Sequence, residues 1–254
     1  MAKEEISEKI TGDRVKGFFS ESIALDHYEE AVQRVGLWRS EEKVFTRVFD
    51  PSESILDLGT GAGRVALGLW ELGYDKIMGV DFSRAMIQKA RHLAKILDYR
   101  VPFRTEDATR LSFEDELFEG VIFAFNGWMQ IPGRENRWQV TREIARILRP
   151  GGHLVFTTHD RGQGKLRMFA EKQAAEWARG TQDPRLLEFG DNLFESSAGT
   201  IFMHLPDREE ILQMLEQGGL LPIFDALRSE IANEPVEVRN FSDECRFWVA
   251  QKPQ

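Results

Sequence analysis

A glycine-rich segment preceded by an acidic residue is the part of this 254-residue chain whose residue types and spacing point most clearly to chemistry. The short apolar run Ser54 to Leu58 leads into this segment, Asp57 to Gly63 (DLGTGAG), and Val65, Leu69 and Leu72 then recur at helical spacing. Glycine allows a sharp turn and lets a ligand lie against the backbone without a Cβ clash. The segment therefore predicts a strand, a ligand-binding turn and a helix.

Two further carboxylates follow the next two predicted strands. Asp81 comes directly after the strand predicted from Lys76 to Val80, and Asp107 comes after the one predicted from Val101 to Thr105. In a parallel sheet, ligands bind in the crevice beyond the carboxyl ends of the strands, where an acid can accept the hydroxyls of a ribose. Asp107 could meet an adenine amino group. Together with Asp57, these positions describe a slot shaped for a nucleoside, although either Asp81 or Asp107 alone could be a helix cap.

The elements that must position these acids alternate between strands and helices, which predicts a doubly wound α/β sheet. Phe118 to Phe125 is nearly all apolar and should be a central strand. His153 to Thr158 predicts the fifth strand, and Leu221 to Leu227 and Arg246 to Ala250 predict a closing pair. We expect four parts: an N-terminal helical cap (1–50, with helices over 24–35 and from a cap at Ser40), a core (51–158), an inserted lid or substrate element (159–206), and a helix with the strand pair (207–254).

These motifs resemble those of the class I S-adenosylmethionine-dependent methyltransferases, of the small-molecule type. The first motif is Ile55 to Gly63, the second is the acid Asp81, the third is Asp107-Ala108 and the fourth is Phe118 to Trp128. The resemblance is strong from Ser54 to Phe156. It implies a Rossmann-like, mostly parallel seven-stranded sheet with an antiparallel last strand, S-adenosylmethionine as cofactor and S-adenosylhomocysteine as product.

The resemblance also assigns cofactor contacts by position. The methionine end would meet Asp57, Gly59, Thr60 and Gly61. The ribose would meet Asp81, and the adenine would lie between Phe82 and Met86 with its edge at Asp107 and Ala108. Asn126 would lie near the sulfonium. Because this cofactor carries a sulfonium and an ammonium and no phosphate, acids around it are favourable, whereas Asp57 would repel a pyrophosphate.

The acceptor side is predicted less fully. Tyr28, Trp38 and Trp128 could face the sulfonium through cation–π contacts, and with His159 they form the predicted substrate pocket. A sulfonium methyl is already activated, so no catalytic residue is obligatory. His159, just beyond the fifth predicted strand, is the candidate base for an acceptor that must lose a proton.

Two other functions stay open. Gly61 to Ala66 also fits the dinucleotide pattern G-x-G-x-x-A with Asp81 downstream, which would indicate an NAD(P)-dependent oxidoreductase. A binding module that holds the cofactor without catalysis is the second alternative. Binding of S-adenosylhomocysteine against NAD(P), and transfer of a labelled methyl group, would separate these functions.

Composition limits the partners. A formal net charge of -9 and the sequence after the fourth strand, Asn126 to Met129, argue against nucleic acid, because that sequence departs from the Asn/Asp-Pro-Pro-aromatic motif of adenine or cytosine amino methylases. The longest uncharged stretch, Gly120 to Gly133, is too short to cross a membrane. The single Cys245 leaves no cysteine cluster for a metal and fits a reducing cytoplasm. We expect a small-molecule substrate and a monomer or homodimer. One predicted helix face should be exposed to solvent or bind an acidic partner; it carries Arg134, Arg137, Arg142, Arg146 and Arg149.

Overall fold

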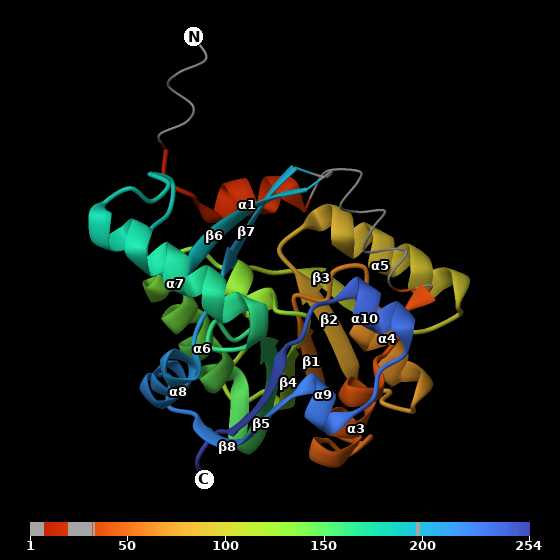
Figure 1. Cartoon of the computed structure of the whole chain (residues 1–254). Coiled ribbons are helices and arrows are strands. Elements are labelled where there is room, and N and C mark those ends of the chain that lie inside the picture. Colours follow the sequence, from red (N-terminus) through yellow and green to blue (C-terminus); the bar gives the residue numbers. More distant parts are fainter. Residues whose placement is uncertain (1–7, 20–31, 33, 197–198) are drawn as a thin grey trace.

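A seven-stranded sheet forms the centre of the protein, with the strands in the order β3-β2-β1-β4-β5-β9-β8 (Figure 1). The computed structural model describes residues 8–19, 32, 34–196 and 199–254. The strands are β1 (Ile55–Leu58), β2 (Ile77–Asp81), β3 (Phe103–Thr105), β4 (Phe118–Phe123), β5 (Leu148–Thr158), β8 (Leu221–Leu227) and β9 (Arg246–Gln251). The pairs from β3 across to β5 are parallel, whereas β9 is antiparallel to both β5 and β8. The predicted fold, including its antiparallel last strand, is confirmed.

Helices cover both faces of the sheet because its central strands are apolar on both sides. Ile55 packs into one hydrophobic core and its neighbour Leu56 into the other, as the period of two in a strand requires. The first core joins the sheet to α3 (Arg39–Val48), α4 (Arg64–Glu71) and α5 (Arg84–Ile96). The second joins it to α6 (Arg134–Ile147) and α8 (Arg208–Gln217) (Figure 1).

The glycine-rich turn has the backbone conformation that its composition predicts. Gly59 has a φ of 69°, and a Cβ there would meet the Phe123 ring at 2.7 Å, so both the backbone and the space require glycine. Gly63, with a φ of 95°, is the N-cap of α4. The turn therefore lies at the carboxyl end of β1 and leads directly into a helix.

The N-terminal part differs from the prediction in two places. A short helix, α1 (Gly12–Phe18), forms ahead of the two helices that the sequence predicted for this part; Thr11 caps it by accepting a hydrogen bond from Arg14 N at 3.4 Å. The helix predicted over 24–35 lies mostly outside the described residues. The prediction of a cap at Ser40 is wrong, because α3 already begins at Arg39. There, Glu41 Oε2 accepts from Trp38 N at 2.9 Å and takes the place of a hydroxyl cap.

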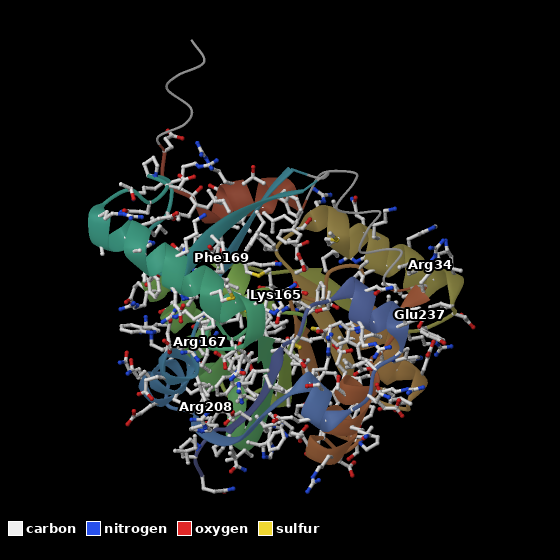
Figure 2. The ribbon with its side chains drawn as sticks, viewed as in Figure 1. Arg34, Lys165, Arg167, Phe169, Arg208 and Glu237 are labelled. Atoms are coloured by element: carbon white, nitrogen blue, oxygen red, sulfur yellow. The ribbon has the colours of Figure 1, made fainter. Side chains whose placement is uncertain are left out.

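The segment after β5 forms a layer of its own above the carboxyl ends of the strands (Figure 1). It contains α7 (Gly164–Arg179) and an antiparallel hairpin, β6 (Asp191–Ser196) and β7 (Gly199–His204). Gln173 Nε2 of α7 donates to Asp191 O at 2.7 Å. Phe169 of α7, labelled in Figure 2, stacks on Phe194 with ring centroids 6.4 Å apart. At the start of the helix, Lys165 Nζ pairs with Asp243 Oδ1 at 2.7 Å. Helix and hairpin thus pack as one unit.

The remaining short elements complete the edges. They are η1 (Gly127–Gln130), which follows β4, and α9 (Arg228–Ile231) and α10 (Val236–Phe241), which lie between β8 and β9. The expectation that Arg137 lies on an exposed helix face is wrong, because its side chain is 1% exposed and pairs with Glu188 at 2.6 Å. In the part of the chain that the structure describes, no helix is long and apolar enough to cross a membrane.

Candidate cofactor and acceptor site

A cavity of about 570 Å³ lies at the carboxyl ends of the central strands. Its walls come from the ends of β1, β2 and β4, from residues 105–109 at the end of β3 and in the turn that follows, from α1, and from residues 130–132 at the end of η1. This is the place where a doubly wound sheet opens a crevice for a ligand. The predicted strand ends therefore meet at one cavity.

Asp81 lines this cavity and is held in place by two backbone donors. Its Oδ2 accepts from Gly61 N at 2.9 Å, and its Oδ1 accepts from Ser83 N at 2.8 Å. The hydroxyl of Ser83, not the carboxylate of Asp81, caps α5 by accepting from Met86 N. Burial raises the pKa of Asp81 to about 6, against the opposing effect of the two backbone hydrogen bonds. Each carboxylate oxygen keeps a lone pair that a ligand hydroxyl can use.

Asp57 lies behind the glycine turn and not in the wall of the large cavity. Its Oδ2 accepts from Thr60 Oγ1 at 2.5 Å and from Ala66 N at 3.2 Å, so it braces the turn. Burial raises the pKa of Asp57 to about 7. A small hollow of about 40 Å³ lies beside Asp57 and Thr60, and it shares Gly59 and Gly61 with the large cavity as wall residues.

The residues predicted to surround an adenine line the same cavity. Phe82 and Met86 lie at the junction of β2 and α5, and Asp107 and Ala108 lie in the turn after β3. Asp107 Oδ1 accepts from the amide and the hydroxyl of Thr109, at 2.8 and 2.7 Å. This leaves Oδ2 as the carboxylate oxygen that holds no described partner.

Buried Asn126 and half-buried His159 form a pair, and neither is among the described residues that line the cavity. His159 Nδ1 lies 2.8 Å from Glu244 O, which can only accept, so Nδ1 carries a proton. Burial lowers the pKa of His159, so its Nε2 is the acceptor for Asn126 Nδ2 at 3.3 Å. Both ring nitrogens are therefore occupied, and Asn126 Oδ1 is buried without a partner.

The aromatic residues proposed for a substrate pocket lie elsewhere. Trp38 is 1% exposed, and it lies between two guanidinium groups, those of Arg64 and Arg228, at 4.9 and 5.3 Å from its ring centroid. Trp128 is 2% exposed in the core beneath the hairpin, where Arg137 lies 5.4 Å from its ring. Neither tryptophan is among the described wall residues of the cavity, and this is a correction. Their cation–π partners are arginines of the protein. Tyr28 lies outside the described residues.

Sequence analysis missed the wall opposite the strands. It is made by α1, including Asp13 and Lys16, and by Gln130 and Ile131. The spacing of Val15, Phe18 and Phe19 in the sequence would have indicated a short amphipathic helix. Gln130, the last residue of η1, gave no signal, because a single glutamine in the sequence follows no pattern that marks a site.

The charges of the cavity decide which cofactor fits. Its described wall holds four carboxylates, of Asp13, Asp81, Glu106 and Asp107, and one ammonium, of Lys16. Such a wall attracts a sulfonium and an ammonium and repels a diphosphate.

The amides of the turn give a second argument. Thr60 N donates to Val80 O, Gly61 N to Asp81 Oδ2 and Gly63 N to Thr60 O, each at 2.9 Å. In a dinucleotide site, amides at the start of this helix bind the pyrophosphate. Here these three amides already donate to acceptors within the protein. The residues present therefore fit S-adenosylmethionine and do not fit NAD(P).

Comparisons with known proteins agree. Residues 55–152 match the family described as a methyltransferase domain. The chain is 29% identical over 233 residues to "Methyltransferase GfsG" of Streptomyces halstedii, covering 87% of this chain and 77% of that protein. It is 35% identical over 130 residues to a demethylmenaquinone methyltransferase of Bacteroides fragilis, covering 49% of this chain and 51% of that protein. The chain thus spans about half the length of the second relative.

The solved structures show the same fold. A structure described as a SAM-dependent methyltransferase from Methanosarcina mazei superposes with a TM-score of 0.66 at 19% identity, and the match covers 83% of this chain and 97% of that one. This likeness supports the fold alone, while the sequence matches and the charges of the cavity concern the cofactor. The family match, the relatives and the shared fold together support a class I S-adenosylmethionine-dependent methyltransferase.

Proposed function

We propose that this protein transfers a methyl group from S-adenosylmethionine to a small molecule bound in the same cavity. The cavity continues from the strand ends to a second wall made by α1 and residues 130–132, which carries this proposal. The cofactor supplies a methyl group already activated by the sulfonium. The protein's task is to align donor and acceptor and to exclude water.

In this proposal the strand ends hold the cofactor. Asp81, fixed by Gly61 N and Ser83 N, accepts the ribose hydroxyls. Phe82 and Met86 flank the adenine, whose edge meets Asp107 and Ala108. The methionine end extends towards Gly59, Gly61 and the small hollow beside Asp57 and Thr60. Asn126 lies near the sulfonium, with its orientation fixed by His159.

The acceptor then lies between α1 and Gln130. Gln130 is half-buried, and its amide can donate and accept hydrogen bonds. His159 has both ring nitrogens occupied, so we assign it to holding Asn126 and not to taking a proton. The acceptor's proton, where there is one, leaves to water.

The proposal also includes the class of the acceptor, the cell compartment and the oligomeric state. The negative net charge and the acidic cavity wall disfavour a nucleic acid acceptor. The Bacteroides relative is named for demethylmenaquinone, a small molecule, which supports an acceptor of that size class. We propose a cytoplasmic protein because its single cysteine, Cys245, is buried and unpaired. We propose that it acts as a monomer or a homodimer.

A screen with methyl-labelled S-adenosylmethionine tests this function. The protein is incubated with separate pools of small phenols, amines, thiols and carboxylic acids, and with transfer RNA and unfolded protein as polymer controls. Product masses then identify the acceptor. We expect label in one of the small-molecule pools. Label confined to a polymer would contradict the proposed acceptor class, while the cofactor assignment would stand.

A further inference from the structure

A buried histidine lies at the base of the β6–β7 hairpin. His204, at the end of β7, is fully buried. Its Nδ1 lies 2.8 Å from Asp191 Oδ1, at the start of β6, and its Nε2 lies 2.7 Å from Glu210 Oε1, in the first turn of α8. One imidazole ring therefore joins both strands of the hairpin to a helix of the main core. We call Asp191, His204 and Glu210 the latch.

The two partners determine the protonation of the ring. An ionised carboxylate only accepts hydrogen bonds, so a ring between two of them needs a proton on each nitrogen. Asp191 Oδ2 also accepts from Leu187 N and Glu188 N, at 3.0 and 3.1 Å, which stabilises its ionised form. Burial raises the pKa of Glu210, but the contact with His204 and the nearby Arg161 and Arg137 outweigh this and lower it to about 2. His204 is accordingly an imidazolium.

The surrounding charges complete the latch. From α6, Arg137 lies 2.6 Å from Glu188 and 3.8 Å from Glu210. From the end of β5, Arg161 lies 3.0 Å from Glu210 and 2.6 Å from Asp207. On the far side of Glu188, Arg134 pairs with its other oxygen at 3.0 Å.

The same cluster has the spacing of a metal site. Ligand atoms of Glu188, Asp191 and His204 lie within 4.8 Å of one another. However, each of the three already has a partner, and the guanidinium of Arg137 supplies the positive charge at Glu188. A metal ion would have to displace protein cations, so the cluster is better explained as a closed network of ion pairs.

The hairpin that the latch holds reaches the cofactor end of the cavity. Phe202 of β7 is buried in a cluster with Val15 and Phe19 from the α1 region and with Met86. Phe82 and Leu193 pack against this cluster. The hairpin therefore supports Phe82 and Met86, which line the cavity, and also α1, which forms the opposite wall.

We propose that His204, as an imidazolium, is a positioning residue that holds the hairpin on the core. It thereby keeps the hairpin and α1, which we call the cover, closed over the adenosyl part of the cofactor. The inference rests on the proposed assignment of Phe82 and Met86 to the adenine. A neutral His204 ring has one N–H and can donate to only one of the two carboxylates, of Asp191 and Glu210. The hairpin then separates from α8 more often. Opening of the cover sets how fast the bound cofactor product leaves.

The test measures the dissociation rate of S-adenosylhomocysteine by stopped-flow competition, for the full chain and for His204→Gln. We expect dissociation about tenfold faster in the variant, because it loses a doubly charge-assisted hydrogen bond. The exposed His92→Gln is the matched control and should leave the rate unchanged.

Two further measurements keep the outcome clear. If His204→Gln does not fold, Glu210→Gln replaces it, and faster dissociation is again expected. Addition of Zn²⁺ or EDTA should leave the rate unchanged, and a metal-dependent rate would overturn the ion-pair explanation. A folded variant with the unmodified protein's dissociation rate would also overturn the proposal. Failure of the unmodified protein to bind S-adenosylhomocysteine would instead refute the proposed cofactor site itself.

Discussion

Asp81 is the residue on which the cofactor site depends most. Two backbone donors fix its carboxylate at the cavity wall, so its remaining lone pairs face a ligand without further reorganisation. We predict that Asp81→Ala weakens S-adenosylhomocysteine binding by about 2 to 4 kcal/mol, from the loss of two hydrogen bonds to a charged acceptor. Calorimetry measures the change, with the exposed Asp75→Ala as control. Equal affinity in the Asp81 variant would remove the role assigned to it.

The same carboxylate predicts a pH dependence of binding. Burial raises the pKa of Asp81 to about 6, and the ionised form is the better acceptor for hydroxyl groups. Affinity for S-adenosylhomocysteine should therefore fall as the pH drops through about 6, and Asp81→Asn should flatten that part of the profile. Folding stability changes in the opposite sense. Because the pKa is raised on folding, the contribution of this group is largest below the unfolded pKa and is lost as the pH rises through about 6.

The His159 prediction shows why a residue's role could not be read from its position alone. Its place after the fifth strand was predicted correctly, but its partners come from Asn126 and from Glu244, 85 positions away in the sequence. We predict that His159→Gln lowers the rate of methyl transfer. The shape of the pH profile of that rate should stay the same, because the variant loses no catalytic base. Steady-state rates across neutral pH test this. If the variant instead lost one limb of the pH–rate profile near neutral pH, His159 would act as a base.

At the scale of elements, a buried ion pair joins α3 to α4. Arg64 contacts Glu41 through both of its terminal nitrogens, at 2.5 and 2.6 Å, and the two side chains are 8% and 0% exposed. Removal of one partner leaves a buried charge without compensation. We predict that Glu41→Ala lowers the free energy of unfolding by about 3 to 5 kcal/mol. Denaturant titration measures this, and the exposed Glu42→Ala, on the same turn, should change it by less than about 1 kcal/mol.

The elements differed in how well the sequence predicted them. β1 and α4 were predicted because an apolar run and a helical period meet at a glycine-rich turn, and β4 was predicted because it is nearly all apolar. The hairpin was missed because its strands, Asp191–Ser196 and Gly199–His204, bury polar residues such as Asp191 and His204, which disturb the alternation of apolar side chains. Helix α7 was missed for a related reason: Gln173 is the one buried residue of its sixteen.

At the scale of the whole molecule, the cofactor half of the cavity could be predicted from the sequence and the acceptor half could not. The strand ends are set by local patterns, and the parallel topology then brings Asp81 and Asp107 to one cavity. The acceptor wall joins α1 to residues 130–132, which are more than 100 positions apart in the sequence, and packing alone brings them together. Trp38 and Trp128 were assigned to that wall by their chemistry, although nearby arginines hold both of them inside the protein.

The central claim is that the acidic cavity at the strand ends binds a cationic adenosyl cofactor and rejects a diphosphate. Calorimetric titration with S-adenosylmethionine, and with NAD and NADP under the same conditions, tests it most directly. The structure predicts one site per chain for S-adenosylmethionine and no measurable heat of binding for either dinucleotide, because the cavity wall is acidic and three amides of the glycine turn already donate within the protein. Tight binding of NAD or NADP, with none of S-adenosylmethionine, would contradict the claim.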